Sequence, residues 1–140
     1  MSARAFVDTN VFVYVFDDDA PEKQATAREL LHSDGREYEF VLSTQVLQEF
    51  YVAATRKLDR PLDGATALEA VRSLSQLSVV QIDPAMVESA IRLSMAHSVS
   101  FWDALIIRAA VTSDCAVLLS EAMQDGRRFD ELRIENPFRA

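Results

Sequence analysis

Three acidic residues of this sequence lie next to apolar runs, where a carboxylate can face a cleft instead of open solvent. Asp8 directly follows the apolar run at 5–7, and Asp103 directly precedes the apolar run at 104–107. Glu49 lies at the rim of the apolar stripe of a predicted helix over 44–57. Carboxylates that gather in one place repel one another unless a cation neutralises them. Their convergence therefore predicts a site for Mg²⁺ or Mn²⁺, ions that prefer oxygen ligands and assist phosphodiester hydrolysis.

Each of these acids also suits an ordinary structural role in which it does no chemistry. Asp8 is a good cap for a helix that follows it. Glu49, taken alone, is typical of the solvated side of an amphipathic helix. Asp103 lies three residues after Ser100, in the Ser-x-x-Asp pattern of a capping box. Only the convergence of the three acids favours the chemical role over the structural one.

A fourth polar group follows the apolar run at 116–119. It begins with Ser120 and contains two further acids, Glu121 and Asp125, before Gly126. Glycine there allows a tight turn, so an ordinary polar loop is the simpler interpretation. The acids at 17–19 and at 22 are interpreted as solvated residues at the start of a helix.

The elements that must position these residues alternate between strand and helix. Nearly all-apolar runs predict short buried strands at 5–7, 40–42, 79–82, 116–119 and 132–134. Helical periodicity and capping residues predict helices at 21–32, 44–57, 63–77, 84–97 and 101–112. The expected fold class is α/β, a three-layer α/β/α sandwich with a short parallel sheet of about five strands. Ligands bind such sheets beyond the carboxyl ends of the strands, where the strand order reverses, and all four polar groups would meet there.

Composition narrows the class of protein. The 140 residues, 49% hydrophobic and 26% charged, suit a single domain over 1–140. A formal net charge of −8 disfavours a passive binder of phosphate backbones but is compatible with carboxylates that hold a metal ion. Three glycines and two histidines leave no glycine-rich phosphate loop and no histidine-rich zinc site. The single cysteine, Cys115, and the lack of a membrane-length apolar run favour a cytoplasmic protein with no membrane contact.

The four groups, in this order and spacing, resemble the motifs of the PIN-domain ribonucleases, and among them the VapC-type toxins of bacterial toxin–antitoxin pairs. The resemblance rests on FVDTN at 6–10, STQVLQEF at 43–50, SFWDA at 100–104 and LLSE at 118–121, with QDG at 124–126. It covers nearly the whole chain. It implies a PIN-like fold and metal-dependent hydrolysis of RNA phosphodiester bonds, which makes the chain the toxin of a type II toxin–antitoxin system.

The resemblance also implies roles for individual residues and for partners. The expected catalytic residues and metal ligands are Asp8, Glu49 and Asp103, with Asp125 as an auxiliary ligand of Mg²⁺ or Mn²⁺. The expected supporting residues are Thr9, Asn10, Ser120 and Glu121. Candidates for RNA contact are Arg127 and Arg128, and also Arg56 and Lys57. The expected partners are RNA, a small antitoxin of the VapB type that docks near Phe12, Tyr14 and Phe16, and a second copy of the chain in a homodimer.

The sequence departs from the family pattern at one position. Two residues after the serine at the end of the fourth strand the family usually has Asp or Asn, and here the residue is Ala122. Either the site works with three acids and help from Asp125 or Glu121, or Ala122 is an engineered inactivation. A PIN-like binding module without activity is the alternative function. Phosphoaspartate enzymes are disfavoured, since Asn10 replaces the second acid of Asp-x-Asp and no lysine follows Lys57.

Overall fold

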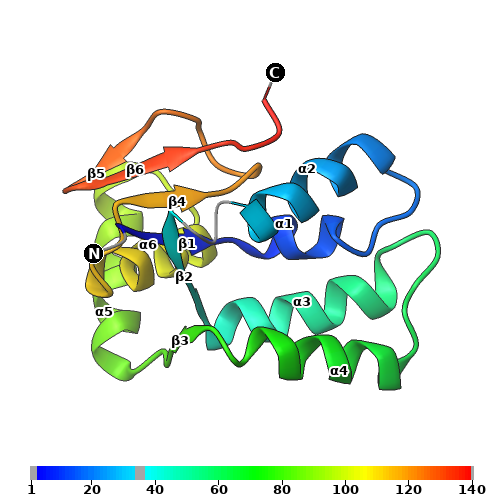
Figure 1. Cartoon of the computed structure of the whole chain (residues 1–140). Helices are drawn as coiled ribbons and strands as arrows, with labels where there is room; N and C mark the ends of the chain where they lie inside the picture. Colours follow the sequence, from blue (N-terminus) through cyan, green and yellow to red (C-terminus); the bar gives the residue numbers. More distant parts are fainter. Residues whose placement is uncertain (1–2, 34–36, 140) are drawn as a thin grey trace.

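The computed structural model describes residues 3–33 and 37–139, and Figure 1 shows them as a central sheet surrounded by helices. The strands are β1 (Ala3–Val7), β2 (Tyr38–Ser43), β3 (Ser78–Val80), β4 (Val117–Leu119), β5 (Arg128–Phe129) and β6 (Leu132–Glu135). The helices are α1 (Thr9–Tyr14), α2 (Pro21–Ser33), α3 (Thr44–Arg56), α4 (Gly64–Leu74), α5 (Pro84–His97) and α6 (Phe101–Thr112). None of the described helices is long and apolar enough to cross a membrane.

The strands form one sheet in the order β3-β2-β1-β4-β6-β5. All neighbouring pairs are parallel except β5 and β6, which form a short antiparallel hairpin. The strand order reverses beside β1, where β2 lies on one side and β4 on the other. The predicted α/β fold with a mainly parallel sheet is confirmed, with six strands instead of about five. The additional strand, β5, has two residues and is too short to produce a periodic signal in the sequence.

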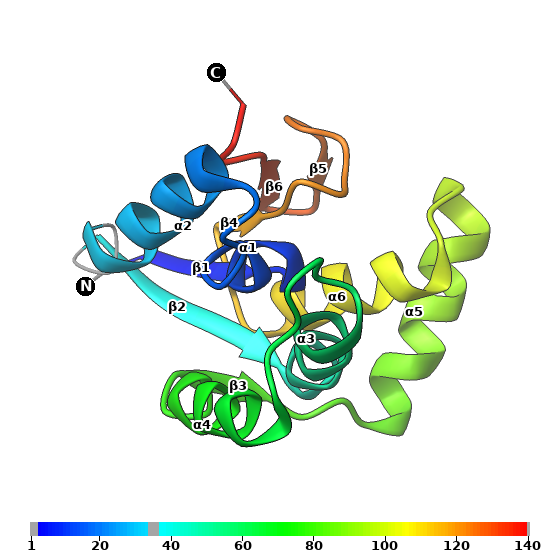
Figure 2. The ribbon, with the colours of Figure 1, turned by 90° about the vertical axis from the view of Figure 1, so that its right-hand side faces the viewer.

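The central strands are nearly all apolar where they pass through the core, because both faces of the sheet are covered there. Phe6 pairs with Val41 of β2 and with Leu118 of β4, and all three side chains are fully buried. Figure 2 shows α2 on one side of the sheet and the pair α5 and α6 on the other. A parallel sheet sandwiched in this way buries both faces of each strand. This explains why the strands are continuous apolar runs without an alternating pattern.

The helices begin where side-chain caps satisfy their first backbone N–H groups. Ser43, Asp63, Asp83 and Ser100 cap α3, α4, α5 and α6 respectively, each accepting a hydrogen bond from a backbone N–H in the first turn. The Ser100 cap was expected from the sequence. The short helix α1 was not among the predicted helices, although Asp8 was considered as a cap, because the apolar run at 11–14 shows no helical period.

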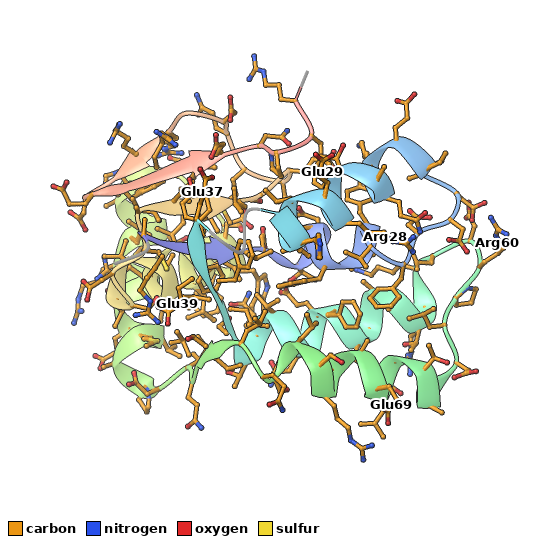
Figure 3. The ribbon with its side chains drawn as sticks, viewed as in Figure 1. Arg28, Glu29, Glu37, Glu39, Arg60 and Glu69 are labelled. Atoms are coloured by element: carbon orange, nitrogen blue, oxygen red, sulfur yellow. The ribbon has the colours of Figure 1, made fainter. Side chains whose placement is uncertain are left out.

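Two arginines fix the segment between α1 and α2. Arg28 donates two hydrogen bonds to the Val15 carbonyl, at 3.1 and 2.9 Å. Arg60, in the loop after α3, pairs with Asp19 at 3.1 Å. Figure 3 shows Arg28 and Arg60 at the same end of the molecule, on neighbouring segments. A surface pair of this kind stabilises by at most about 1 kcal/mol, so these contacts mainly set the position of the segment.

Candidate active site

A cleft of about 680 Å³ opens beyond the carboxyl ends of β1 and β2 and is lined by α1, α3 and α6. Asp8, Glu49 and Asp103 all line it. They come from the end of β1, from α3 and from the first turn of α6. The backbone N–H of Asp8 donates to the Leu119 carbonyl at 3.0 Å, which ties the ends of β1 and β4 together. The structure therefore brings together the three acids that the sequence singled out.

Asp8 is the most buried of the three acids, with 5% of its surface exposed. One carboxylate oxygen accepts the Thr9 backbone N–H at 2.8 Å, so the residue caps α1 as well as facing the cleft. The other accepts the Ser120 hydroxyl at 2.7 Å and the Asn10 amide at 3.3 Å. Burial raises the pKa of Asp8, and the charges of Glu49 and Asp103 raise it further, against the lowering effect of its hydrogen bonds. The cap and the cleft roles are thus combined in one side chain.

Glu49 is held on the cleft side of α3 by two hydrogen bonds. The Thr9 hydroxyl donates to one carboxylate oxygen at 3.0 Å, and the side-chain amide of Gln45 donates to the other at 3.1 Å. Gln45 is itself buried, and the same amide nitrogen donates to the Trp102 carbonyl at 3.2 Å. Gln45 therefore links α3 to the start of α6.

Asp103 is positioned by the first turn of α6. Its backbone N–H donates to the Ser100 hydroxyl at 3.1 Å, as the Ser-x-x-Asp pattern predicts. Burial raises the pKa of the Asp103 carboxyl, and the charge of Glu49 adds to this effect, whereas hydrogen bonding with Ser100 lowers it. The negative charge of Glu49 therefore acts on the Asp103 carboxyl. A cation between them would relieve that repulsion.

The supporting residues form a network behind Asp8. Asn10 donates to Asp8 and accepts the Glu121 backbone N–H at 3.0 Å. Ser120, fully buried, donates to Asp8 and accepts the Ala122 backbone N–H at 3.1 Å. The loop after β4 and the start of α1 are thereby fixed to the same carboxylate.

Glu121 does not point its carboxylate into the cleft. One oxygen accepts the Tyr14 hydroxyl at 2.6 Å, and the other pairs with Lys23 at 2.5 Å. Burial alone would raise the pKa of Glu121, but hydrogen bonds from Lys23 and Tyr14 outweigh it and hold the pKa below its usual value. The side chain joins the loop after β4 to α1 and α2, so its support of the site is indirect.

Asp125, expected from the sequence to be an auxiliary metal ligand, has other partners in the structure. Its carboxylate accepts the Asn136 backbone N–H at 2.8 Å and the Arg139 guanidinium at 3.2 Å. It does not line the cleft, and the next residue, Gly126, has a positive φ of 84°. Asp125 instead fixes the segment after β6.

Residue 122 faces the cleft in a way that residue 125 does not. Ala122 lines the main cleft with Asp8 and also lines a smaller adjoining hollow of about 170 Å³ with Asp103. Arg127 lines that hollow too, where its guanidinium donates to the His97 carbonyl at 3.1 Å and lies over the Phe129 ring. The position of the missing fourth acid is thus on the cleft wall.

Of the other basic residues expected to contact RNA, only Lys57 lies at the cleft. Lys57 lines the main cleft, whereas Arg128 lies in β5, is exposed and lines neither hollow. Arg56, at the end of α3, is also exposed and outside the cleft. The sequence predicts that Asp17 is a solvated acid at the start of a helix. In the structure it lines the cleft. Among the described residues, the cleft therefore has four acids and one basic residue.

Sequence reasoning missed Gln45 and Trp102. Gln45 precedes Glu49 by four residues, the spacing at which helical side chains meet, and this was the available signal. Trp102 directly precedes Asp103 and lines the cleft with 62% of its surface exposed. A tryptophan in the first turn of an apolar helix was interpreted only as part of the setting of Asp103.

The donor set of the cleft suits a hard divalent cation. Three carboxylates and the Ser120 hydroxyl supply oxygen atoms alone, which is the preference of Mg²⁺ and Mn²⁺. Across the described residues, however, no three acidic, histidine or cysteine side chains are gathered closely enough to form a ready metal cluster. The chemistry of the donors fits the ion. Burial is the main cause that raises the pKa values of Asp8 and Asp103, and the charges of neighbouring acids add to it.

The chain belongs to the PIN domain family, whose domain matches residues 5–132. No curated protein resembles the sequence closely enough to count as a match. PIN-domain nucleases generally use divalent metal ions, in agreement with the oxygen-rich donor set.

Several solved structures share the fold. A toxin–antitoxin complex from Klebsiella pneumoniae is similar with a TM-score of 0.70 at 17% identity, over 95% of this chain and 97% of that chain. VapBC2 from Rickettsia felis, bound to a DNA fragment from its promoter, gives 0.67 at 17% identity, over 94% and 97%. VapC20 from Mycobacterium tuberculosis, a toxin that cleaves the sarcin–ricin loop, gives 0.65 at 20% identity, over 81% and 86%.

Proposed function

We propose that the chain is a metal-dependent endoribonuclease that hydrolyses RNA phosphodiester bonds. The observation that carries the proposal is the convergence of Asp8, Glu49 and Asp103 on one cleft, where the pKa of the buried Asp8 carboxyl is raised by burial and by the two neighbouring acids. Membership of the PIN family supports the reaction class. Neighbouring carboxylates repel one another in the free protein, and a bound cation would remove that repulsion.

Mg²⁺ or Mn²⁺ would be held by Asp8, Glu49 and Asp103. When bound, the ion supplies the charge that stabilises the attacking and leaving oxygens of phosphodiester hydrolysis. The chain supplies position: Thr9 and Gln45 orient Glu49, and the Ser120 hydroxyl orients Asp8. Small displacements of reacting groups reduce rates by large factors, so these hydrogen bonds matter for the reaction although they bind no substrate.

We further propose that the protein is the toxin of a type II toxin–antitoxin system, acts in the cytoplasm and forms a homodimer. Support comes from the fold, which is shared with the toxin–antitoxin complexes named above. A cleft lined by acids would attract an arginine-bearing segment of an antitoxin. Of the three residues near which the partner was expected to dock, Phe12 is buried, whereas Tyr14 and Phe16 are partly exposed.

A catalytically inactive PIN-like module is the second candidate, and Ala122 favours it. Residue 122 lines the cleft beside Asp8 and Asp103, where the family usually has a fourth acid or amide. Glu121 and Asp125 are committed to other partners and do not replace it. A module of this kind would bind Mn²⁺ weakly and cleave no RNA.

The test is cleavage of single-stranded and hairpin RNA by the purified chain with Mn²⁺ or Mg²⁺, and again with excess chelator. Cleavage that needs the ion and is abolished in Asp103→Asn supports the proposal. Glu88→Gln is the matched control, since Glu88 is an exposed α5 acid outside both hollows. No cleavage of any RNA at saturating Mn²⁺, by the chain or by Ala122→Asp, would favour the inactive module.

A further inference from the structure

One wall of the acid cleft is apolar and carries an exposed indole ring. Trp102 is 62% exposed, and Val52, also on the cleft wall, is 44% exposed. Val13, Ala53 and Ile106 continue the wall. A contiguous apolar wall of this kind beside polar residues is typical of a ligand-binding groove.

The indole is held at a fixed place relative to the acids. Trp102 directly precedes Asp103 in the first turn of α6, and its carbonyl accepts the Gln45 amide that also holds Glu49. The Phe101 ring packs edge-on against the indole, with ring centroids 5.0 Å apart and planes at 71°. Despite this contact, 62% of the surface of Trp102 stays exposed.

The charge of the cleft limits how RNA can be bound there. The described lining residues include the acids Asp8, Asp17, Glu49 and Asp103, against the single basic residue Lys57. The whole chain carries a formal charge of −8. Such a surface repels phosphates wherever no cation neutralises it, so the backbone attraction that basic RNA-binding proteins use is weak here outside the metal site. Contacts that do not depend on charge would add to the affinity.

We propose that the face of Trp102 is a stacking platform for an unpaired nucleobase beside the scissile phosphate. The inference rests on the proposed ribonuclease function. Trp102 directly precedes Asp103 and lines the same cleft, so a base on this ring would lie beside the acids of the proposed site. Bases in a duplex are stacked on one another and cannot reach the ring, whereas bases of loops and single strands can. A base–aromatic stack tolerates any base.

The test uses the fact that Trp102 is the only tryptophan of the chain. Its intrinsic fluorescence is followed while a random-sequence RNA octamer is added to the Asp8→Asn variant with Mg²⁺, and while an octamer of abasic residues is added in the same way. The abasic octamer has the same phosphates and no bases. The expected result is quenching by the RNA octamer and little change with the abasic octamer. Equal responses to both octamers, or no response to the RNA, would overturn the platform.

Steady-state cleavage by otherwise native variants gives a second readout. Trp102→Ala should raise KM between about 5-fold and 100-fold, the range expected for losing one base–aromatic stack, while Trp102→Phe should restore most of the loss. Tyr51→Ala is the matched control, because Tyr51 is an exposed aromatic residue of α3 outside the cleft. An unchanged KM in Trp102→Ala would contradict the inference.

The outcomes separate this inference from the proposed function. Base-dependent quenching without cleavage by the native chain would support the platform and reject the ribonuclease. Cleavage without base-dependent quenching would support the ribonuclease and reject the platform. A Trp102 signal that responds to an antitoxin protein and to no RNA would show that the ring belongs to a protein interface, and this also rejects the platform.

Discussion

At the scale of single residues, Asp8 combines a helix cap with a buried charge. Its raised pKa means that the folded state holds the proton more tightly than the unfolded state does. The free energy of unfolding should therefore fall as pH rises from 3.8 through the higher folded-state pKa, and remain lowered at neutral pH. Each unit of pKa shift corresponds to about 1.4 kcal/mol.

Replacing Asp8 by Asn should remove this part of the pH dependence. We expect the melting temperature of Asp8→Asn, relative to that of the native chain, to increase between pH 3 and pH 7 in the absence of metal. Both proteins are measured by circular dichroism across that range. A difference in melting temperature that does not change with pH would show that the Asp8 carboxyl is not destabilised by its surroundings.

Residue 122 gives a second prediction at this scale. Because Ala122 lines the cleft and Asp125 is bonded to Asn136 and Arg139, Ala122→Asp should increase RNA cleavage, by about tenfold or more if the added ligand fixes the ion. Asp125→Ala should leave cleavage unchanged and lower the melting temperature slightly. Loss of cleavage in Asp125→Ala together with no gain in Ala122→Asp would restore Asp125 as the fourth ligand.

At the scale of elements, Glu121 holds three of them together. It connects the loop after β4 with α1 through Tyr14 and with α2 through Lys23. The backbone N–H of the same residue donates to Asn10, which contacts Asp8. The strut, our name for the contacts among Lys23, Tyr14 and Glu121, is therefore linked to Asp8 through Asn10. The charges of Lys23 and Glu121 do not line the cleft.

The lowered pKa of Glu121 predicts when this strut contributes to stability. A carboxyl whose folded-state pKa lies below its usual value of 4.5 stabilises the fold above that pH, and the contribution is lost as pH falls through the folded-state pKa. Glu121→Gln should therefore melt below the native chain at pH 7, by less than about 4 °C for a partly exposed pair, and the difference should shrink toward pH 3. Glu69→Gln, at the exposed Arg72 pair of α4 (Figure 3), is the control and should show a smaller effect. A Glu121→Gln difference that is equal at both pH values would rule out the charge contribution.

Most elements could be predicted from the sequence because each carries its own local signal. Ser43, Asp63 and Ser100 mark helix starts, and Asp83 followed by Pro84 marks another. Strand β5 lacks such a signal because it has only two residues, and α1 has only its cap, Asp8, before a short apolar run without a helical period. Both depend on contacts with distant segments, which a local pattern does not contain.

The candidate site divides in the same way. Asp8, Glu49 and Asp103 could be found because each sits at the edge of an apolar run. The ion pairs of Glu121 with Lys23 and of Asp125 with Arg139 could not be predicted. The partners are 98 and 14 residues apart in the sequence, and no periodicity relates them. The role of Trp102 at the cleft wall likewise emerges only when α3 and α6 are seen side by side.

At the scale of the whole molecule, metal binding should stabilise the fold. An ion that binds only the folded state, present at about 100 times its Kd, adds about 2.7 kcal/mol. For a chain of this size that corresponds to a rise in melting temperature of roughly 10 °C. The measurement is thermal unfolding of the native chain with millimolar Mn²⁺, against NaCl of equal ionic strength. An equal rise in NaCl would mean that general screening of the net charge, not a specific site, causes the stabilisation.

The central claim is that Asp8, Glu49 and Asp103 form one metal site, and crystals of the native chain soaked in Mn²⁺ test it most directly. Anomalous diffraction at the manganese absorption edge locates the ion without reference to activity. The account predicts an anomalous peak in the cleft within coordination distance of carboxylate oxygens from Asp8 and at least one of the other two acids. A strong peak only at Asp125 or on the outer surface, or an empty cleft at saturating Mn²⁺, would contradict it.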